Sequence, residues 1–225
     1  MNHSAIEQKA RLLQYEIWHQ RAILFPSGAP PLRMCAPDVA ARVLGVEYEV
    51  RPTIASGNAG YRVAGQVDRG RGIISVSGEF AYEVQRYTGA HEVGHLMLHP
   101  EIGNGTAHRD RPVGVGPDDR ARPLAEQEAD YFAACFLAPR RLFREAFEMR
   151  FGSAPLHLDE NIAFYIAGRE GRLLVTEPPG SLRFGMAVAR AEWLGGPRFT
   201  SLAAMFGLSP KAVAIRLREL GLLAA

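Results

Sequence analysis

The spacing of apolar residues along the first part of the chain predicts helices followed by a small sheet. Apolar positions recur at helical intervals over residues 5–25, with polar residues between them, which is typical of an amphipathic helix. A second, short helix is expected to run from Asp38, a candidate N-cap, to Leu44. Three short β-prone runs separated by turn residues then indicate a hairpin-rich sheet, with strands at 46–50, 61–67 and 72–76.

One long helix is predicted between Glu79 and His99. This segment contains no proline and only two glycines, its apolar residues recur at helical intervals, and Pro100 closes it. Residues 100–122 then hold four glycines and three prolines, which favours a long exposed loop. A loop of this length is usually reserved for function.

Helices with short connections are predicted through the rest of the chain, and the last two of them form a helix-turn-helix pattern. The predicted helices cover 124–137, 139–149, 156–167, 182–194, 199–206 and 210–219. Gly207 suits a turn between the last two, Ser209 caps the final helix, and Pro210 takes its first position. This end of the chain therefore has helix-turn-helix character. We expect two parts, a main domain at 1–175 and a helical subdomain at 176–225.

The composition is that of a soluble globular protein. Of the 225 residues, 47% are hydrophobic and 22% are charged, which excludes collagen, coiled coil and wholesale disorder. No apolar run approaches the length of a membrane span, and the N-terminus lacks a basic region followed by an apolar one, so neither export nor membrane insertion is expected. Two cysteines lying 100 residues apart indicate free thiols in a reducing cytoplasm.

The net charge of +2 does not by itself indicate nucleic-acid binding, but the charge is unevenly distributed. From residue 181 to the end there are six cations against two anions. One interpretation is weak DNA contact through Lys211, Arg216 and Arg218 of the last helix. The other is a helical subdomain that packs on the main domain or docks the substrate. The small number of cations favours the second interpretation.

The motif HEVGH at 91–95 lies inside the long predicted helix and carries metal chemistry. His91 and His95 are four residues apart and share a helix face, so both imidazoles can hold a zinc ion. Glu92 then flanks the metal, where it can take a proton from a metal-bound water and later pass it to a leaving amine. The alternative is a pair of surface histidines, which the following apolar residues disfavour because they make this helix a core element.

A hydrolytic zinc site normally needs a third protein ligand, and the helix predicted at 124–137 offers three acids. Glu126 and Asp130 share a face of that helix, whereas Glu128 points roughly 200° away from Glu126. This arrangement suggests Glu126 as the ligand and Asp130 as the hydrogen-bond partner that fixes the tautomer of a ligating histidine. An acidic first turn that favours the helix dipole is the alternative reading.

Four further residues are candidates for supporting roles. His99 lies about 12 Å along the helix from His91, so it does not easily reach the same ion, and it is expected to cap the C-terminus of the helix. An oxyanion on the substrate needs a hydrogen-bond donor. The sequence offers His108, Tyr131 and Tyr165 for that task without ranking them.

The segments around both motifs, 87–100 and 126–139, closely resemble the ImmA/IrrE family of bacterial zinc metallopeptidases. The resemblance implies an α+β fold with a zincin-like, gluzincin-type core, in which a small β-sheet packs on the motif helix. It also implies zinc as the cofactor, His91 and His95 as ligands, and Glu92 as the catalytic acid and base. Counting back from Pro139 in the family signature places the third ligand at Glu126.

The resemblance further implies a protein substrate, usually a helix-turn-helix transcriptional repressor cut at one site to relieve repression of mobile-element or stress-response genes. The sequence departs from the usual pattern where Ala138 precedes Pro139 and where Asp130 replaces a frequent asparagine, and Glu128 also matches a common family position. The competing hypothesis is a DNA-binding regulator with a structural or sensing zinc centre. His99 or Asp130 would then supply a fourth ligand.

Overall fold

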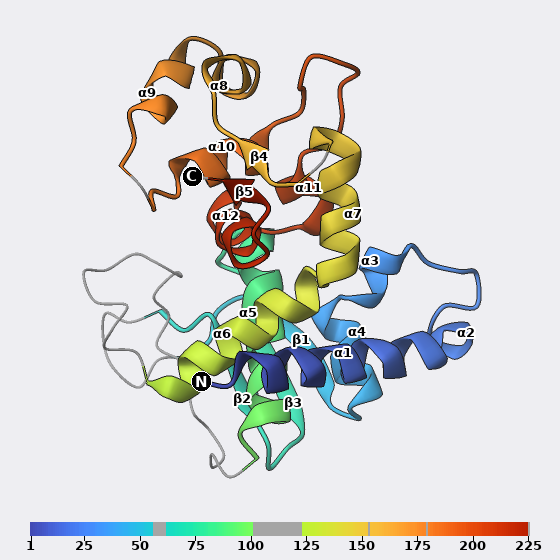
Figure 1. Cartoon of the computed structure of the whole chain (residues 1–225). Helices are drawn as coiled ribbons and strands as arrows, with labels where there is room; N and C mark the ends of the chain where they lie inside the picture. Colours follow the sequence, from blue (N-terminus) through green and yellow to red (C-terminus); the bar gives the residue numbers. More distant parts are fainter. Residues whose placement is uncertain (56–61, 101–122, 153, 179, 225) are drawn as a thin grey trace. The chain divides into compact units, whose positions relative to one another are not determined.

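The computed structural model of the chain is mixed α+β, mostly helical with a small sheet (Figure 1). It describes residues 1–55, 62–100, 123–152, 154–178 and 180–224. The chain divides into two compact units, Met1–Leu137 and Ala138–Ala225. This structural division falls earlier than the boundary after residue 175 that the sequence suggested. The assignment of residues 1–175 to a peptidase domain and 176–225 to a helical subdomain stays a prediction.

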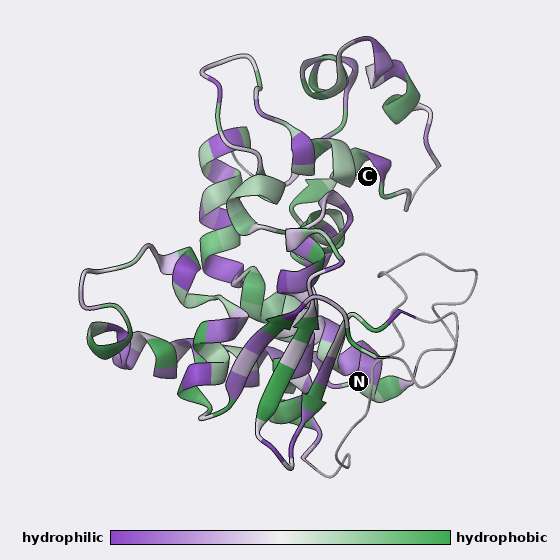
Figure 2. Cartoon of the chain, turned by 180° about the vertical axis from the view of Figure 1, so that it is seen from behind, coloured by the Kyte–Doolittle hydropathy of each residue, from purple (hydrophilic) through white to green (hydrophobic). Residues whose placement is uncertain are grey.

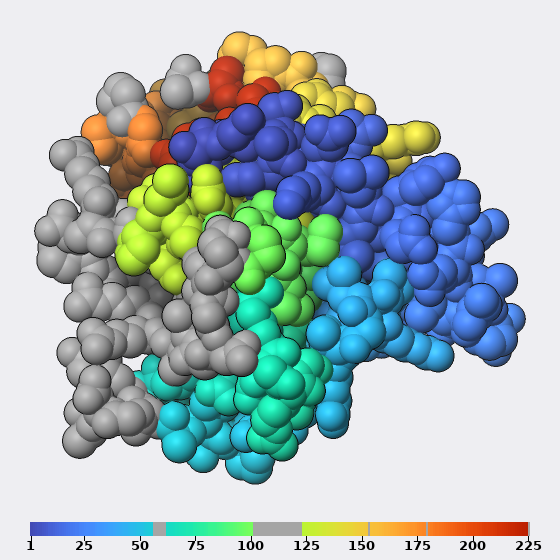
Figure 3. All heavy atoms as spheres, turned by 90° about the horizontal axis from the view of Figure 1, so that it is seen from below, coloured from blue at the N-terminus to red at the C-terminus, as the bar shows by residue number. Residues whose placement is uncertain are grey.

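Helix α1 opens the first unit and runs along helix α6 (Leu124–Leu137), as Figure 3 shows from below. It is an amphipathic helix as predicted, with its buried residues spaced three and four apart along one stripe. Asp38 is not an N-cap, because the helix predicted to start after it already begins at Pro37. The Asp38 carboxylate pairs with Arg33 instead. The N-terminal helices are α1 (His3–His19), α2 (Arg21–Leu24), α3 (Pro31–Met34) and α4 (Pro37–Val43).

In the described part of the first unit, three strands form a sheet in the order β1-β3-β2. Strand β3 lies at the centre and four of its five residues are buried, which agrees with its mostly hydrophobic colour in Figure 2. Only β2 and β3 form an antiparallel hairpin, whereas β1 runs parallel to β3. The expected hairpin-rich sheet is thus partly wrong, because the chain passes from β1 to the far edge before it returns through the centre. The strands are β1 (Glu47–Arg51), β2 (Gly65–Asp68) and β3 (Ile73–Ser77).

Helix α5 (Tyr82–Leu98) carries the histidine motif and lies between the sheet and α6. It contacts β2 and β3 on one side and packs along α6 on the other. The prediction of one long helix ending before Pro100 is confirmed. Because α5 is covered from two sides, its middle is buried, and polar side chains there must find partners within the fold.

The second unit is mainly helical. Residues 156–157 form a strand instead of the predicted helix start, because the Leu156 N–H donates to Leu222 O and helix α8 begins only after its N-cap, Asp159. Between the last two helices, Gly207 has a left-handed φ of 59° and Ser209 caps the final helix, as predicted. The elements are α7 (Arg140–Phe151), β4 (Leu156–His157), α8 (Glu160–Ala167), η2 (Gly168–Glu170), α9 (Gly171–Val175), α10 (Arg183–Arg190), α11 (Leu202–Phe206), α12 (Pro210–Glu219) and β5 (Leu223–Ala224).

Arg216 was grouped with the candidate DNA contacts, but the structure buries its side chain. It is only 1% exposed, its Nε donates to Ala138 O at 3.1 Å, and its Nη1 pairs with Glu219 Oε2 at 3.0 Å. A guanidinium held inside the unit cannot reach a phosphate. Arg216 therefore stabilises the packing of α12, and the interpretation of this residue as a DNA contact is wrong.

Two sequence expectations concern the environment of the chain. Among the described residues, no helix is both long and apolar enough to cross a bilayer. Cys35 and Cys135 are buried thiols, as predicted. Burial raises the pKa of the Cys35 thiol to about 12, against the opposing effect of Arg86, so this group stays protonated at neutral pH.

Candidate metal centre

The two histidines of the HEVGH motif face each other on the buried side of α5. His91 is 6% exposed and His95 is 3% exposed. The spacing of four residues brings the rings edge to face, with their Nε2 atoms 3.0 Å apart. This confirms the shared face that the motif predicts.

Glu126 reaches this pair from α6. Its Oε2 lies 3.4 Å from His91 Nε2 and its Oε1 lies 3.5 Å from His95 Nε2. The ligand atoms of the three residues all lie within 4.8 Å of one another, which makes them a candidate metal site. Glu128 is directed elsewhere, because its Oε2 lies 3.1 Å from His99 Nε2. The geometry thus brings together the three residues that the sequence singled out.

The outer ring nitrogens of both histidines are hydrogen-bonded. His91 Nδ1 lies 2.8 Å from Asp130 Oδ1, and His95 Nδ1 lies 3.1 Å from His99 Nδ1. If each Nδ1 carries the proton of a neutral imidazole, the two Nε2 lone pairs point at each other across 3.0 Å. Two lone pairs at that distance repel unless a proton or a cation lies between them. The donor set therefore fits a bound cation.

The electrostatics of His91 lead to the same conclusion. Burial lowers its pKa, but hydrogen bonds to Asp130 and Glu126, with the charge of Glu92, outweigh burial and raise the pKa to about 10. A positive charge at this position is therefore stabilised by three surrounding carboxylates. A proton supplies that charge in the metal-free chain, and a divalent cation would supply more of it.

Glu92 is fully buried beside His91, at the side of α5 that contacts the sheet. The first residue of β2, Gly65, passes directly over it. A Cβ at position 65 would lie 3.2 Å from Glu92 Oε1 and would collide with Thr88 Cγ2. Glycine is therefore required for this approach of strand and helix. Sequence reasoning missed Gly65, whose only signal was a glycine inside the strand predicted at 61–67.

A second close approach, between α5 and α6, brings the acidic residues Glu126, Glu128 and Asp130 of α6 near the histidines. Gly94 lies against Ala129, and a Cβ at position 94 would be 3.1 Å from Ala129 O and 3.2 Å from Ala129 Cα. Tyr87 fixes the same two helices by donating from its hydroxyl to Asp130 O at 3.0 Å. The glycine inside the histidine motif thus allows α6 to come near enough for short acidic side chains to reach the imidazoles.

We expect Gly94→Val to lower the free energy of unfolding by about 1–3 kcal/mol, because the added methyl groups overpack the contact with Ala129. Urea denaturation measures this loss. Ala5→Val, at an exposed position of α1, is the matched control, since it changes only helix propensity and costs about 0.7 kcal/mol or less. Equal losses in the two variants would contradict the close-packing argument.

Three of the four other sequence candidates, His99, Tyr131 and Tyr165, lie within the described residues, and each has its own contacts. The ring of Tyr131 stacks on His3, with ring centroids 4.2 Å apart, while Tyr165 belongs to the second unit and contacts Trp193. His108 lies outside the described residues. His99 is the C-cap residue of α5, as the sequence predicted, and its backbone N–H donates to His95 O at 3.1 Å. Arg69 adds to this cap, because its Nη2 donates to His95 O at 2.6 Å and to His99 O at 2.8 Å. The imidazole of His99 lies between His95 Nδ1 and Glu128 Oε2, so the capping contacts at this end of the helix come from the His99 backbone and from Arg69.

Two histidines four residues apart on a helix, a carboxylate from a second helix and a glutamate next to the first histidine are the arrangement of a metal-dependent hydrolase. Comparison with protein-family models gives the particular family. Residues 42–162 match Peptidase_M78, the IrrE N-terminal-like domain. The chain therefore belongs to the ImmA/IrrE family of metallopeptidases, as the resemblance predicted. A search of curated proteins found no significant match.

Proposed function

We propose that the protein is a zinc-dependent endopeptidase in which His91, His95 and Glu126 bind the metal. The distances among their ligand atoms carry this proposal. Two ligands about 2.0–2.1 Å from a tetrahedral zinc ion lie about 3.3 Å apart. Here the two Nε2 atoms are 3.0 Å apart, His91 Nε2 lies 3.4 Å from Glu126 Oε2, and His95 Nε2 lies 3.5 Å from the other oxygen, Glu126 Oε1. With one ligand atom from each residue, the three atoms lie within 4.8 Å of one another. A mixed set of two imidazoles and one carboxylate is also the usual ligand set of catalytic zinc in proteases.

The number of ligands supports catalysis over a purely structural role. A structural zinc site is closed by four protein ligands, and His99 and Asp130 were the candidates for the fourth. Both instead lie at the Nδ1 atoms of the ligand histidines, on the far side of each ring from Nε2. Among the described residues, a set of three ligands remains, which leaves one position for water or substrate.

The chain's own residues then have distinct roles in hydrolysis. The bound zinc would lower the pKa of a water molecule and polarise the scissile carbonyl group. Glu92 accepts the proton of that water and delivers it to the leaving nitrogen, so the peptide bond breaks into a carboxylate and an amine. Asp130 accepts a hydrogen bond from His91 Nδ1, which keeps the lone pair of Nε2 free for the metal.

The proposed substrate is a helix-turn-helix transcriptional repressor in the cytoplasm, cleaved at one site. This part of the proposal rests on the family resemblance, and the consequence of cleavage would be derepression of mobile-element or stress-response genes. The alternative remains a DNA-binding regulator with a sensing zinc centre, which would use Lys211 and Arg218 of the C-terminal helices.

We expect the zinc-loaded protein to cleave a purified repressor that is encoded beside its gene. Cleavage should stop after a chelator removes the zinc and should resume when zinc is restored. Electrophoresis and mass spectrometry of the fragments measure cleavage and locate the site. A repressor kept with chelated protein is the control. If zinc-loaded protein leaves every neighbouring repressor intact but binds duplex DNA in a salt-dependent way, the regulator is the better description.

A further inference from the structure

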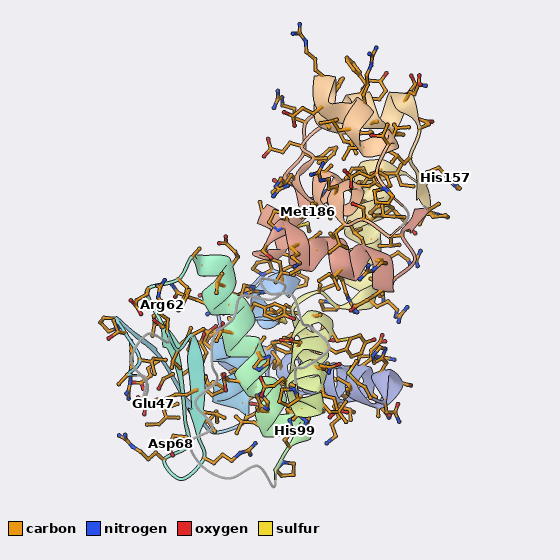
Figure 4. The ribbon with its side chains drawn as sticks, turned by 90° about the vertical axis from the view of Figure 1, so that its left-hand side faces the viewer. Glu47, Arg62, Asp68, His99, His157 and Met186 are labelled. Atoms are coloured by element: carbon orange, nitrogen blue, oxygen red, sulfur yellow. The ribbon has the colours of Figure 1, made fainter. Side chains whose placement is uncertain are left out.

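His99 occupies a defined place between the candidate metal centre and a second carboxylate. Its Nδ1 lies 3.1 Å from His95 Nδ1, and its Nε2 lies 3.1 Å from Glu128 Oε2. The His99 side chain is 8% exposed, and the Glu128 side chain is 23% exposed. Figure 4 shows His99 at the end of α5, beside α6. The contacts form a continuous series from Glu128 through His99 to His95.

The protons in this series can be placed by elimination. A neutral His95 that binds a metal through Nε2 must carry its proton on Nδ1. His99 Nδ1 lies next to that proton and must accept it as a hydrogen bond, so the proton of a neutral His99 is on Nε2. That N–H donates to Glu128, which offers only acceptors as a carboxylate. Both ring nitrogens of His99 and the Nδ1 of His95 then have hydrogen-bond partners with one consistent set of tautomers.

The backbone holds His99 in this position. The residue leaves the helix with φ −125° and ψ 61°, and Arg69 binds the carbonyl oxygens of both His95 and His99. The ring consequently turns back toward the residue four positions earlier. Glu128 approaches from α6, which comes close to α5 at Gly94. The β2–β3 hairpin supplies Arg69, α5 ends at His99, and α6 supplies Glu128, so three elements fix the position of the His99 ring.

We propose that His99 and Glu128 are positioning residues that fix the orientation and tautomer of His95, as Asp130 does for His91. This inference rests on the proposed function, because it assumes that His95 is a metal ligand. It assigns Glu128, the rival of Glu126 in the sequence, a separate role. It also explains why the two acids can both be present on α6 without competing for the same ion.

The test is zinc affinity, measured by competition with a chromogenic chelator, in variants of the full chain. His99→Leu removes the acceptor for His95 Nδ1, and we expect zinc affinity to fall about 10–100-fold. His99→Asn should restore most of that affinity, since its amide oxygen can occupy the position of Nδ1 and accept the same hydrogen bond. Rescue by asparagine distinguishes positioning of His95 from a general effect on packing.

Glu128→Leu supplies an independent variant that does not alter α5. We expect a several-fold loss of zinc affinity, and no further loss when it is combined with His99→Leu, because Glu128 acts through His99. Glu83→Leu removes the same charge near the opposite end of α5 and is the control, with wild-type affinity expected. Cobalt absorption should keep its shape and intensity in Glu128→Leu, because the three ligands are unchanged.

Wild-type zinc affinity in both His99→Leu and Glu128→Leu would overturn the inference while leaving the proposed metal site intact. A cobalt spectrum that loses a ligand in Glu128→Leu would also overturn it, since Glu128 would then bind the metal itself. If the wild-type chain binds no zinc, the proposed function fails first. The outcomes for the two proposals are therefore distinguishable.

Discussion

Glu92→Gln is expected to fold, to keep its zinc and to cleave the repressor about 10²–10⁴ times more slowly than the wild type, which corresponds to roughly 3–5 kcal/mol of barrier. The amide is nearly isosteric with the carboxylate, so the close contact with Gly65 is preserved. The three proposed ligands are unchanged. What disappears is the group that takes the proton of water and returns it to the leaving nitrogen.

The measurement is the rate of repressor cleavage by wild type and Glu92→Gln at matched zinc occupancy. Glu83→Gln makes the same chemical change in the first turn of α5 and should cleave at the wild-type rate. Residual hydrolysis by Glu92→Gln should still depend on the metal. Equal rates for Glu92→Gln and the wild type would remove Glu92 from the mechanism.

The second large effect is loss of the metal itself. We expect about one zinc per wild-type chain, and His91→Ala, His95→Ala and Glu126→Ala should each lower zinc affinity by more than the roughly 10–100-fold that follows loss of a supporting hydrogen bond. Each change removes one of only three ligand atoms in the described site. Because ligands bind in their deprotonated form, zinc occupancy should also fall in acid.

Metal content by mass spectrometry after dialysis against a weak chelator measures this second effect. Glu128→Ala is the matched control for Glu126→Ala, since both variants remove a carboxylate of α6 that contacts a histidine. Glu126 contacts His91, whereas Glu128 contacts His99. We expect Glu128→Ala to retain far more zinc than Glu126→Ala. The reverse order would show that the third ligand was assigned incorrectly, and that the argument from helix facing fails with it.

The gathering of His91, His95 and Glu126, the proposed ligands, could be predicted from the sequence because it depends on local geometry. Spacing of four places His91 and His95 on one face, and the same spacing places Glu126 and Asp130 together on the next helix. The structure brings these four side chains into contact. Helix facing also separated Glu128 from Glu126, although it did not indicate where the Glu128 carboxylate would lie.

The residues that sequence reasoning missed act across long separations. Arg69 reaches the end of α5 from the turn between β2 and β3, and Gly65 matters only because β2 passes over Glu92. Pairing of β1 with β3 was missed for a related reason, since apolar alternation identifies a strand but not its neighbour. The direction of the His99 ring depends on how the backbone leaves α5, which the helical pattern does not specify.

The three proposed ligands lie on two helices, so zinc bound to them would also affect folding. His95 and Glu126 are separated by 30 intervening residues, so an ion bound to both closes a long loop of the chain. Binding to the folded state alone stabilises it by about 2.7 kcal/mol when free zinc is 100 times the dissociation constant. The lifetime of the protein would then follow the zinc supply of the cell. Metal scarcity would reduce both the activity of each molecule and the number of molecules that survive proteolysis.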